Sequence, residues 1–178
     1  MYQEVLDFWF KEIEPAQWWK KSDEFDQLIT DRFADLHTKA VQCELYEWRK
    51  NAFGRLAEII VLDQFSRNMF RGASRSFTYD SLALALSQEA IYCQADQQLN
   101  SAEKAFLYMP YMHSESLFIH EVAVGLFNQE GMESNLDFEI KHKKIIEKFG
   151  RYPHRNDILD RKSTPEEIAF LQKPGSSF

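Results

Sequence analysis

The chain has 178 residues, of which 44% are hydrophobic and 15% aromatic, so it can bury one sizeable core and is unlike a disordered protein. Its 28 acidic and 21 basic residues give a net charge of −7, which argues against general binding to nucleic acid or an anionic membrane. The opening MYQEVLDFWF lacks the basic start of a signal peptide, and no apolar run is long enough to span a membrane. We therefore expect a cytoplasmic protein with a single domain over 1–178, ending in a frayed tail over 173–178. The sequence does not predict its oligomeric state.

The first clear helical pattern follows Ser22. We expect Ser22 to cap this helix and the carboxylates of Asp23 and Glu24 to interact favourably with its dipole. Apolar residues then recur at steps of four and three, at Ile29, Phe33, Leu36, Ala40 and Cys43. A later helix repeats this stepping at Tyr79, Ala83, Leu86, Ala90 and Cys93. Both cysteines are therefore expected in the core as reduced thiols.

Two segments, 56–62 and 117–127, are apolar nearly all round, which predicts buried helices. Pro110 disfavours helical geometry at the residue before it. We therefore expect one helix to end near Tyr108 and the next to begin between Pro110 and Ser114.

The last helix has the clearest start. Thr164 and Glu167 form a capping box with proline at the first helical position, and Ile168 and Leu171 should point inward. With only six glycines and five prolines and with helical periodicity throughout, the sequence predicts an all-α fold of about seven or eight helices.

The first polar motif is LDQFSRNMFRG, residues 62–72. Asp63 and Arg67 lie on the same stripe as buried apolar residues, so they either pair internally or meet a ligand. Asn68 and Arg71 follow where the helix should end near Gly72, and they can face a cleft.

The second motif is YMPYMHSES, residues 108–116. If a helix starts near Ser114, then His113 and Ser114 lie at its amino end and can bind an anion, or one of them can simply cap the helix. A serine hydrolase would need Ser114 to meet a histidine base, but adjacent helical residues such as His113 point in different directions.

The third motif is FGRYPHRND, residues 149–157. Gly150 should end a helix that carries His142 on its apolar face, where a histidine usually makes a structural hydrogen bond. Arg151, His154, Arg155 and Asn156 then follow in a loop. Arginine forks bind carboxylate or phosphate, but the same side chains can instead fasten the loop to helix carbonyls or to acids such as Asp157 and Asp160.

Metal and cofactor signatures are missing from the sequence. No two histidines have the three- or four-residue spacing of a helical zinc site, and there is neither a Gly-rich phosphate loop nor a nucleophile elbow. We expect no metal and no other cofactor.

Together, LDQFSRNMFRG, YMPYMHSES and FGRYPHRNDILDRKSTPEE resemble the signature segments of a mainly bacterial family, domain of unknown function 924. The resemblance runs from LDFWF near the start to TPEEIAFL in the last helix. It implies an all-α fold similar to tetratricopeptide helix hairpins, coiled into a right-handed array with a concave side, and it implies no established activity. The family usually has glycine at the position of Asp160, and glutamine is common at that of His120.

Our leading hypothesis is that the three motifs converge on one cleft that binds a small anionic ligand or an acidic peptide end. The proposed ligand-binding residues are Arg67, Asn68, Arg71, His113, Ser114, Arg151, His154, Arg155 and Asn156. If turnover occurs, His142 or His154 would be the acid or base. The alternative is a protein-interaction scaffold, with an aromatic groove formed by Trp18, Trp19 and Trp48. A hydrolase that uses Ser114 or a histidine base is the lesser alternative.

Overall fold

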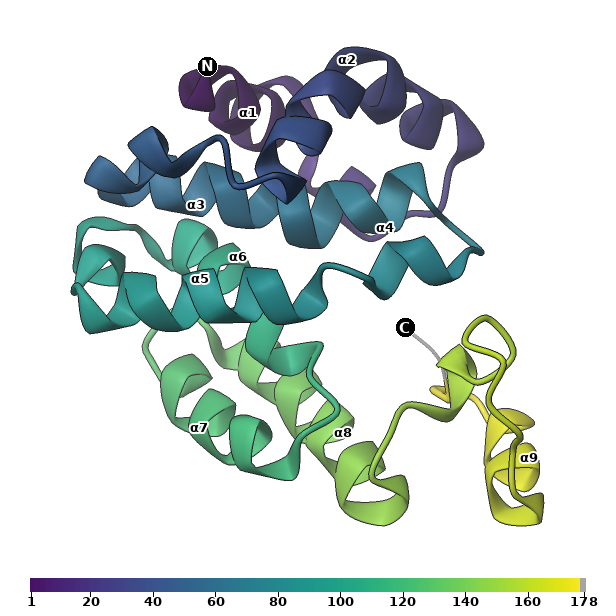
Figure 1. Cartoon of the computed structure of the whole chain (residues 1–178). Helices are drawn as coiled ribbons and strands as arrows, with labels where there is room; N and C mark the ends of the chain where they lie inside the picture. Colours follow the sequence, from purple (N-terminus) through teal and green to yellow (C-terminus); the bar gives the residue numbers. More distant parts are fainter. Residues whose placement is uncertain (177–178) are drawn as a thin grey trace.

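The computed structural model describes residues 1–176, which form helices joined by short loops, with no strand within that range (Figure 1). The all-α prediction is confirmed, whereas the tetratricopeptide-like superhelix stays a prediction. Residues 177 and 178, part of the predicted frayed tail, lie outside the described range.

The amino-terminal helices form one layer (Figure 1). Helix α1 (Tyr2–Asp7) continues into the π-helical turn η1 (Phe8–Glu12), and the 3-10 turn η2 (Pro15–Trp18) leads to α2 (Asp23–Val41). The Ser22 side chain accepts a hydrogen bond from the Phe25 amide, so the predicted cap is confirmed. Ile29, Phe33 and Ala40 are buried as predicted.

The next element is an almost continuous helical rod beneath that layer. After the 3-10 turn η3 (Tyr46–Lys50), the rod comprises α3 (Ala52–Ile60), the π-helical turn η4 (Val61–Phe65) and α4 (Ser66–Met69). Residues 56–62 are all buried, as predicted. A π-helical turn widens the helix locally and changes the direction of the side chains within it, and this one carries Asp63.

The remaining helices pack as antiparallel neighbours below the rod (Figure 1). The 3-10 turn η5 (Ser74–Phe77) precedes α5 (Asp80–Tyr92), and the 3-10 turn η6 (Ala95–Gln98) precedes α6 (Ser101–Met112). Helices α7 (Leu117–Phe127) and α8 (Glu133–Phe149) pack against each other, and α7 also packs on α6.

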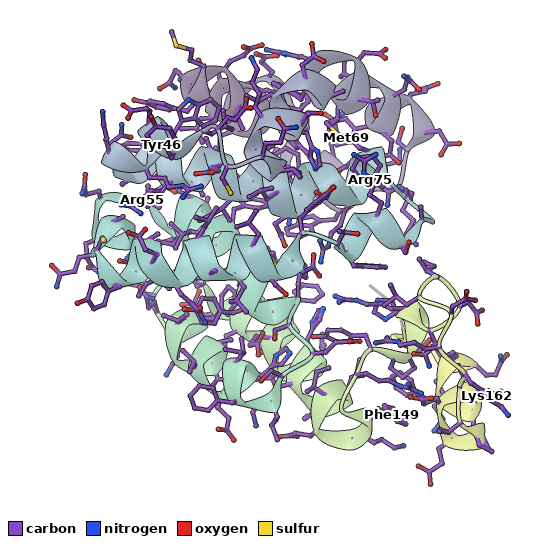
Figure 2. All side chains as sticks on the ribbon, in the orientation of Figure 1. Tyr46, Arg55, Met69, Arg75, Phe149 and Lys162 are labelled. Carbon is purple, nitrogen blue, oxygen red and sulfur yellow. The ribbon has the colours of Figure 1, made fainter. Side chains whose placement is uncertain are left out.

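The carboxy-terminal segment folds back beside α8. Gly150 has a φ of +67°, a left-handed conformation that glycine adopts without strain, and it ends α8 as predicted. The 3-10 turn η7 (Pro153–Arg155) and helix α9 (Pro165–Leu171) follow. The ring of Phe149, labelled in Figure 2, packs on that of Phe170, next to a small core cluster that contains Tyr152. The capping box of Thr164 and Glu167 is confirmed.

The predicted break at Pro110 is wrong. Helix α6 continues through Pro110 to Met112, and α7 begins only at Leu117. Proline removes one helical hydrogen bond, but residues 105–112 are all buried, and their packing outweighs the local preference. As a result, His113 caps the carboxyl end of α6 and does not lie at a helix amino end.

Three predictions of burial are also wrong. Cys43 and Cys93 are exposed because α2 ends at Val41 and α5 at Tyr92, so neither apolar stripe reaches its cysteine. On α7, the side chains of Leu117, Phe118 and Val122 are exposed, since this helix packs mainly on α6 and α8 and leaves one face open. In α9, Ile168 is exposed and Glu167 is buried in its place.

Candidate functional site

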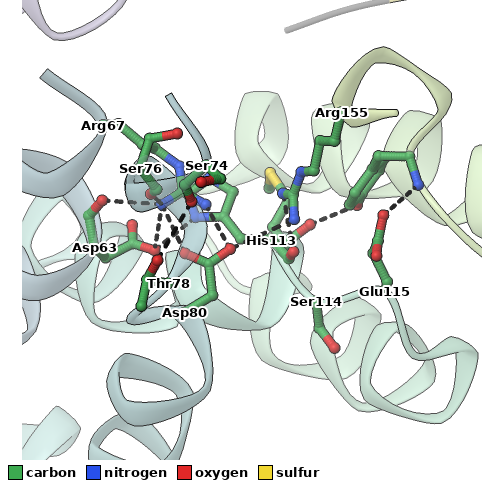
Figure 3. Close-up of polar contacts among 12 residues, drawn as sticks. Asp63, Arg67, Ser74, Ser76, Thr78, Asp80, His113, Ser114, Glu115 and Arg155 are labelled. Atoms are coloured by element: carbon green, nitrogen blue, oxygen red, sulfur yellow. Dashed lines mark hydrogen bonds and ion pairs between the residues drawn. The ribbon is translucent and has the colours of Figure 1, made fainter. Parts of the chain in front are cut away.

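A cavity of about 360 Å³ lies between the start of α5, the α6–α7 junction and the loop after η7 (Figure 3). Hydroxyl, apolar and charged side chains share its wall. Its lining residues are Ser74, Phe77, Thr78, Asp80, Ser81, Leu84, Pro110, His113, Ser114, Glu115, Arg155 and Leu159. Two of the three polar motifs, those at 108–116 and 149–157, therefore meet in one place.

Asp63 of the first motif lies directly behind this wall. Its Oδ1 atom is 2.7 Å from Nδ1 of His113, its Oδ2 atom accepts a 2.5 Å hydrogen bond from Gln64, and the Arg67 guanidinium is 3.6 Å away. Burial favours the neutral carboxyl, but the charge of Arg67 and the hydrogen bonds from His113 and Gln64 outweigh it and lower the pKa of Asp63 to about 2. Asp63 is therefore ionised at neutral pH, and the predicted internal pair with Arg67 is confirmed.

His113 connects Asp63 to the cavity. Burial lowers the pKa of its imidazole, and the nearby positive charge of Arg67 lowers it further, against the opposing effect of Asp63. The ring is therefore neutral at pH 7. Since the ionised Asp63 only accepts hydrogen bonds, Nδ1 carries the proton and Nε2 presents its lone pair. Within residues 1–176, Nε2 has no hydrogen-bond partner, and His113 lines the cavity.

Arg67 and Asp80 form a two-point ion pair at the site (Figure 3). Two guanidinium nitrogens of Arg67 donate to the two carboxylate oxygens of Asp80, at 2.9 and 3.0 Å. The charge of Arg67 is thus neutralised by Asp80 on the cavity side and by Asp63 on the side of the rod. Burial lowers the pKa of Arg67, but these two carboxylates outweigh burial and raise it. Arg67 is a brace that holds the η5–α5 corner against the central rod.

Arg155 is paired much less completely. Its Nη2 atom donates to the carbonyl of His113 at 3.0 Å, but Asp80, already engaged by Arg67, is 3.4 Å from Nη1. Its buried Nε atom has no partner within the described chain. The guanidinium lies between the rings of Phe77 and Tyr152, each centred 4.6 Å away. Burial and the charge of Arg67 lower the pKa of Arg155, as expected for a buried cation that has no close ion pair.

The other acid of the wall, Glu115, is fully engaged. Two nitrogens of Arg161 donate to its carboxylate at 2.6 and 2.9 Å, and the Tyr152 amide donates at 2.7 Å. Burial opposes ionisation, but these contacts lower the pKa of Glu115. The pair fixes the carboxy-terminal loop to the α6–α7 junction.

Two of the predicted ligand-binding residues lie elsewhere. Asn68 and Arg71 both donate to the carboxylate of Asp26 on α2, beside a second, smaller hollow of about 260 Å³. The side chains of Asn68 and Arg71 are therefore engaged with an acid of the protein itself. The helix does end near Gly72 as predicted, but its exit faces α2 and not the main cavity.

Arg151 and Asn156 fasten the carboxy-terminal segment, and neither lines the cavity. Arg151 donates to both oxygens of Glu167, at 2.7 and 2.8 Å, and to the carbonyl of Lys162. Asn156 is buried and donates to Ser163 and Glu167. Fastening was the alternative to ligand binding for this loop, and for these two residues the contacts favour it.

The three candidate catalytic residues differ in position. His142 and His154 are largely buried and do not line the cavity, and burial lowers the pKa of His142 to about 3 and that of His154 to about 4. Ser114 does line it, but its side chain points away from His113 (Figure 3), and its hydroxyl accepts a hydrogen bond from the Ser116 amide. These contacts give no support to a serine nucleophile paired with a histidine base. The histidine placed to accept a proton is His113.

Sequence reasoning missed Asp80, Phe77 and Glu115. Asp80 opens α5 with no motif around it, and its partners Arg67 and Arg155 are 13 and 75 residues away. Only the excess of arginines in the motifs indicated that an acid must lie near them.

The indole groups of the scaffold alternative do not form a clear groove. Trp18 packs on Trp9 and Phe106, Trp48 packs on Tyr2, and only Trp19 is largely exposed. In residues 1–176, no group of three or more His, Cys, Asp or Glu side chains is arranged to hold a metal ion. The helices of this same range are all too short or too polar to cross a membrane.

The fold and cavity define an all-helical protein with a small, charged site at its carboxy-terminal side. A family model described as "Bacterial protein of unknown function (DUF924)" matches residues 5–175, so the chain belongs to this family. It is similar to a solved structure of a protein of unknown function from Agrobacterium tumefaciens, with 38% sequence identity, 96% of each chain covered and a TM-score of 0.92. No curated protein matches the chain.

Proposed function

We propose that the cavity binds a small organic anion, whose charged group is held by Arg155. The observation that carries this proposal is the incomplete pairing of Arg155, a buried cation 3.4 Å from an acid that another arginine already engages. A buried guanidinium whose donors are not all satisfied is costly, and an anionic ligand would give those donors a close partner. Its Nη atoms offer the planar fork that carboxylates and phosphates use.

The remaining wall indicates what kind of anion fits. Asp80 and Glu115 are already paired with Arg67 and Arg161, and at close range their carboxylates would repel the second charge of a dianion. A singly charged carboxylate held by Arg155 avoids this repulsion. Phe77, Leu84, Pro110 and Leu159 offer apolar surface to a short hydrocarbon body. The volume of about 360 Å³ is at the lower end of the usual range of small-molecule sites. These features support a small monocarboxylate.

The test is the melting temperature in chloride, phosphate, sulfate and a series of short monocarboxylates at matched ionic strength. A ligand at about a hundred times its Kd stabilises by about 2.7 kcal/mol, which for this chain length raises the melting temperature by roughly 5 to 10 °C. We expect this rise for a monocarboxylate with the wild type and with Arg151→Gln, but not with Arg155→Gln. Arg151 is the matched control because it lies in the same loop, outside the cavity. Equal rises in all three proteins, or no rise in any, would refute the proposal.

A further inference from the structure

Beside the guanidinium of Arg155, the cavity presents a hydrogen-bond acceptor. His113 is neutral, its Nδ1–H donates to the buried carboxylate of Asp63 at 2.7 Å, and Nε2 is left without a partner in the described chain. A carboxylate that accepts from one ring nitrogen fixes the tautomer and the orientation of the imidazole. In this tautomer Nε2 can accept a proton or a hydrogen bond but cannot donate one.

Asp63 is itself held in place by the fold. It lies in the π-helical turn η4, between the regular turns of α3 and α4. Gln64 donates a hydrogen bond to its Oδ2 atom, and Arg67 lies 3.6 Å from its Oδ1 atom. π-helical turns within α-helices are frequent at functional sites. No contact of His113 within residues 1–176 uses its Nε2 atom. This atom is therefore available to accept a hydrogen bond from a ligand.

The acceptor and the cation are close neighbours. The Nη2 atom of Arg155 donates to the backbone carbonyl of His113 itself, at 3.0 Å. One small molecule can therefore reach both groups only if its anionic group and its hydrogen-bond donor are separated by few bonds. The apolar lining residues Phe77, Leu84, Pro110 and Leu159 would then contact the remainder of that molecule.

Building on the proposed binding of an anion at Arg155, we propose that the ligand is a short hydroxycarboxylate, whose carboxylate meets Arg155 and whose hydroxyl donates to Nε2 of His113. Asp63 is the positioning residue of this contact. His113 thus gives the site its preference for a hydroxyl-bearing acid over the same acid without the hydroxyl.

The first test needs no ligand. In a ¹⁵N NMR spectrum at pH 7, we expect His113 to be neutral with its proton on Nδ1, and Asp63→Asn to weaken this preference, since an amide can also donate to Nδ1. A charged ring, or a proton on Nε2 in the wild type, would overturn the proposal whatever the ligand.

The second test compares matched acids by calorimetric titration: lactate with propionate, and 2-hydroxybutyrate with butyrate. A hydrogen bond of ordinary net strength corresponds to about a two- to ten-fold lower Kd. We expect that advantage for both hydroxy acids with the wild type, its loss with His113→Phe, whose ring has no acceptor, and its retention with His37→Phe. His37 is the matched control because it is a buried histidine bonded to Ser66, outside the cavity.

The outcomes separate this inference from the proposed function. If each pair of acids binds equally and binding requires Arg155, the anion site stands and the inference is wrong. If no acid binds in an Arg155-dependent manner, both are wrong. If His113→Phe does not fold, the comparison of matched acids on the wild type still tests the inference, since a hydroxy acid that binds no better than its partner acid overturns it.

Discussion

Replacing Arg151 by glutamine should destabilise the protein without affecting the cavity. Arg151 donates to both oxygens of Glu167 and to the carbonyl of Lys162, and the same carboxylate accepts from Asn156 and from the Thr164 amide. One buried carboxylate thus joins the end of α8, the loop and the start of α9. Glutamine would remove the only cation in this set of contacts.

The magnitude follows from these contacts. Removing one partner of a buried, charge-assisted pair costs about 3 to 5 kcal/mol. Since the Arg151 side chain is 28% exposed and Glu167 keeps two other donors, we expect about 2 kcal/mol, or a fall in melting temperature of roughly 4 to 8 °C. Urea unfolding of the wild type and of Arg151→Gln measures the difference directly.

The pH dependence has a definite sign. The hydrogen bonds from Arg151 lower the pKa of Glu167 from 4.5 to about 2. Burial opposes this shift, and the hydrogen bond from the Thr164 amide adds to it. A carboxylate with a lowered pKa in the folded state stabilises fully above its unfolded pKa, and this contribution is lost as the pH falls from about 4.5 towards 2. The difference in free energy of unfolding between the wild type and Arg151→Gln should therefore be constant from pH 7 to 5 and should become smaller below pH 4.5. A gap under 0.5 kcal/mol at pH 7, or one that does not narrow by pH 3.5, would refute this account.

Three further predictions concern other parts of the chain. Asp160 has a φ of +55°, so Asp160→Gly should raise the free energy of unfolding by about 0.5 kcal/mol in urea titration, and a loss would show that the aspartate side chain has a structural role. The imidazole of His120 makes hydrogen bonds to the buried Glu139 carboxylate and to the Ser114 carbonyl. His120→Leu should therefore lower the free energy of unfolding by about 2 to 4 kcal/mol in urea titration, and His120→Gln by clearly less. Equal losses in the two variants would contradict this. Burial lowers the pKa of His37 to about 4 and of His142 to about 3, so the unfolded state binds more protons below pH 6.5 and the free energy of unfolding should fall by about 3 kcal/mol for each histidine by pH 4. A double His→Gln variant with the same pH profile as the wild type would refute this.

Local sequence patterns predicted the helices well and the ends of several poorly. The cap at Ser22 and the capping box at Thr164 depend on residues three positions apart, and both are present. The Asp63–Arg67 pair likewise follows from helical spacing. The break at Pro110 failed because burial of the surrounding residues, a property of the whole fold, outweighed the preference of a single residue.

The site was predictable only in part, because its ion pairs join distant segments. Three residues singled out by the motifs do come together: Arg67 and Arg155 both contact Asp80, and Arg155 donates to the carbonyl of His113. Their role in ligand binding stays a prediction. Nothing local distinguishes Arg155, which lines the cavity, from Arg151, four residues earlier, which does not. The difference depends on which acid each meets after packing, and the sequence alone does not determine this.

The most direct test of the anion site at Arg155 is a crystal structure of the protein grown with lactate. We predict a bound molecule in the cavity, with its carboxylate within hydrogen-bond distance of the Arg155 guanidinium and its body against Phe77 and Leu84. A cavity that holds only water, with Arg155 drawn into a close pair with Asp80, would contradict the proposed function and identify these arginines as internal braces.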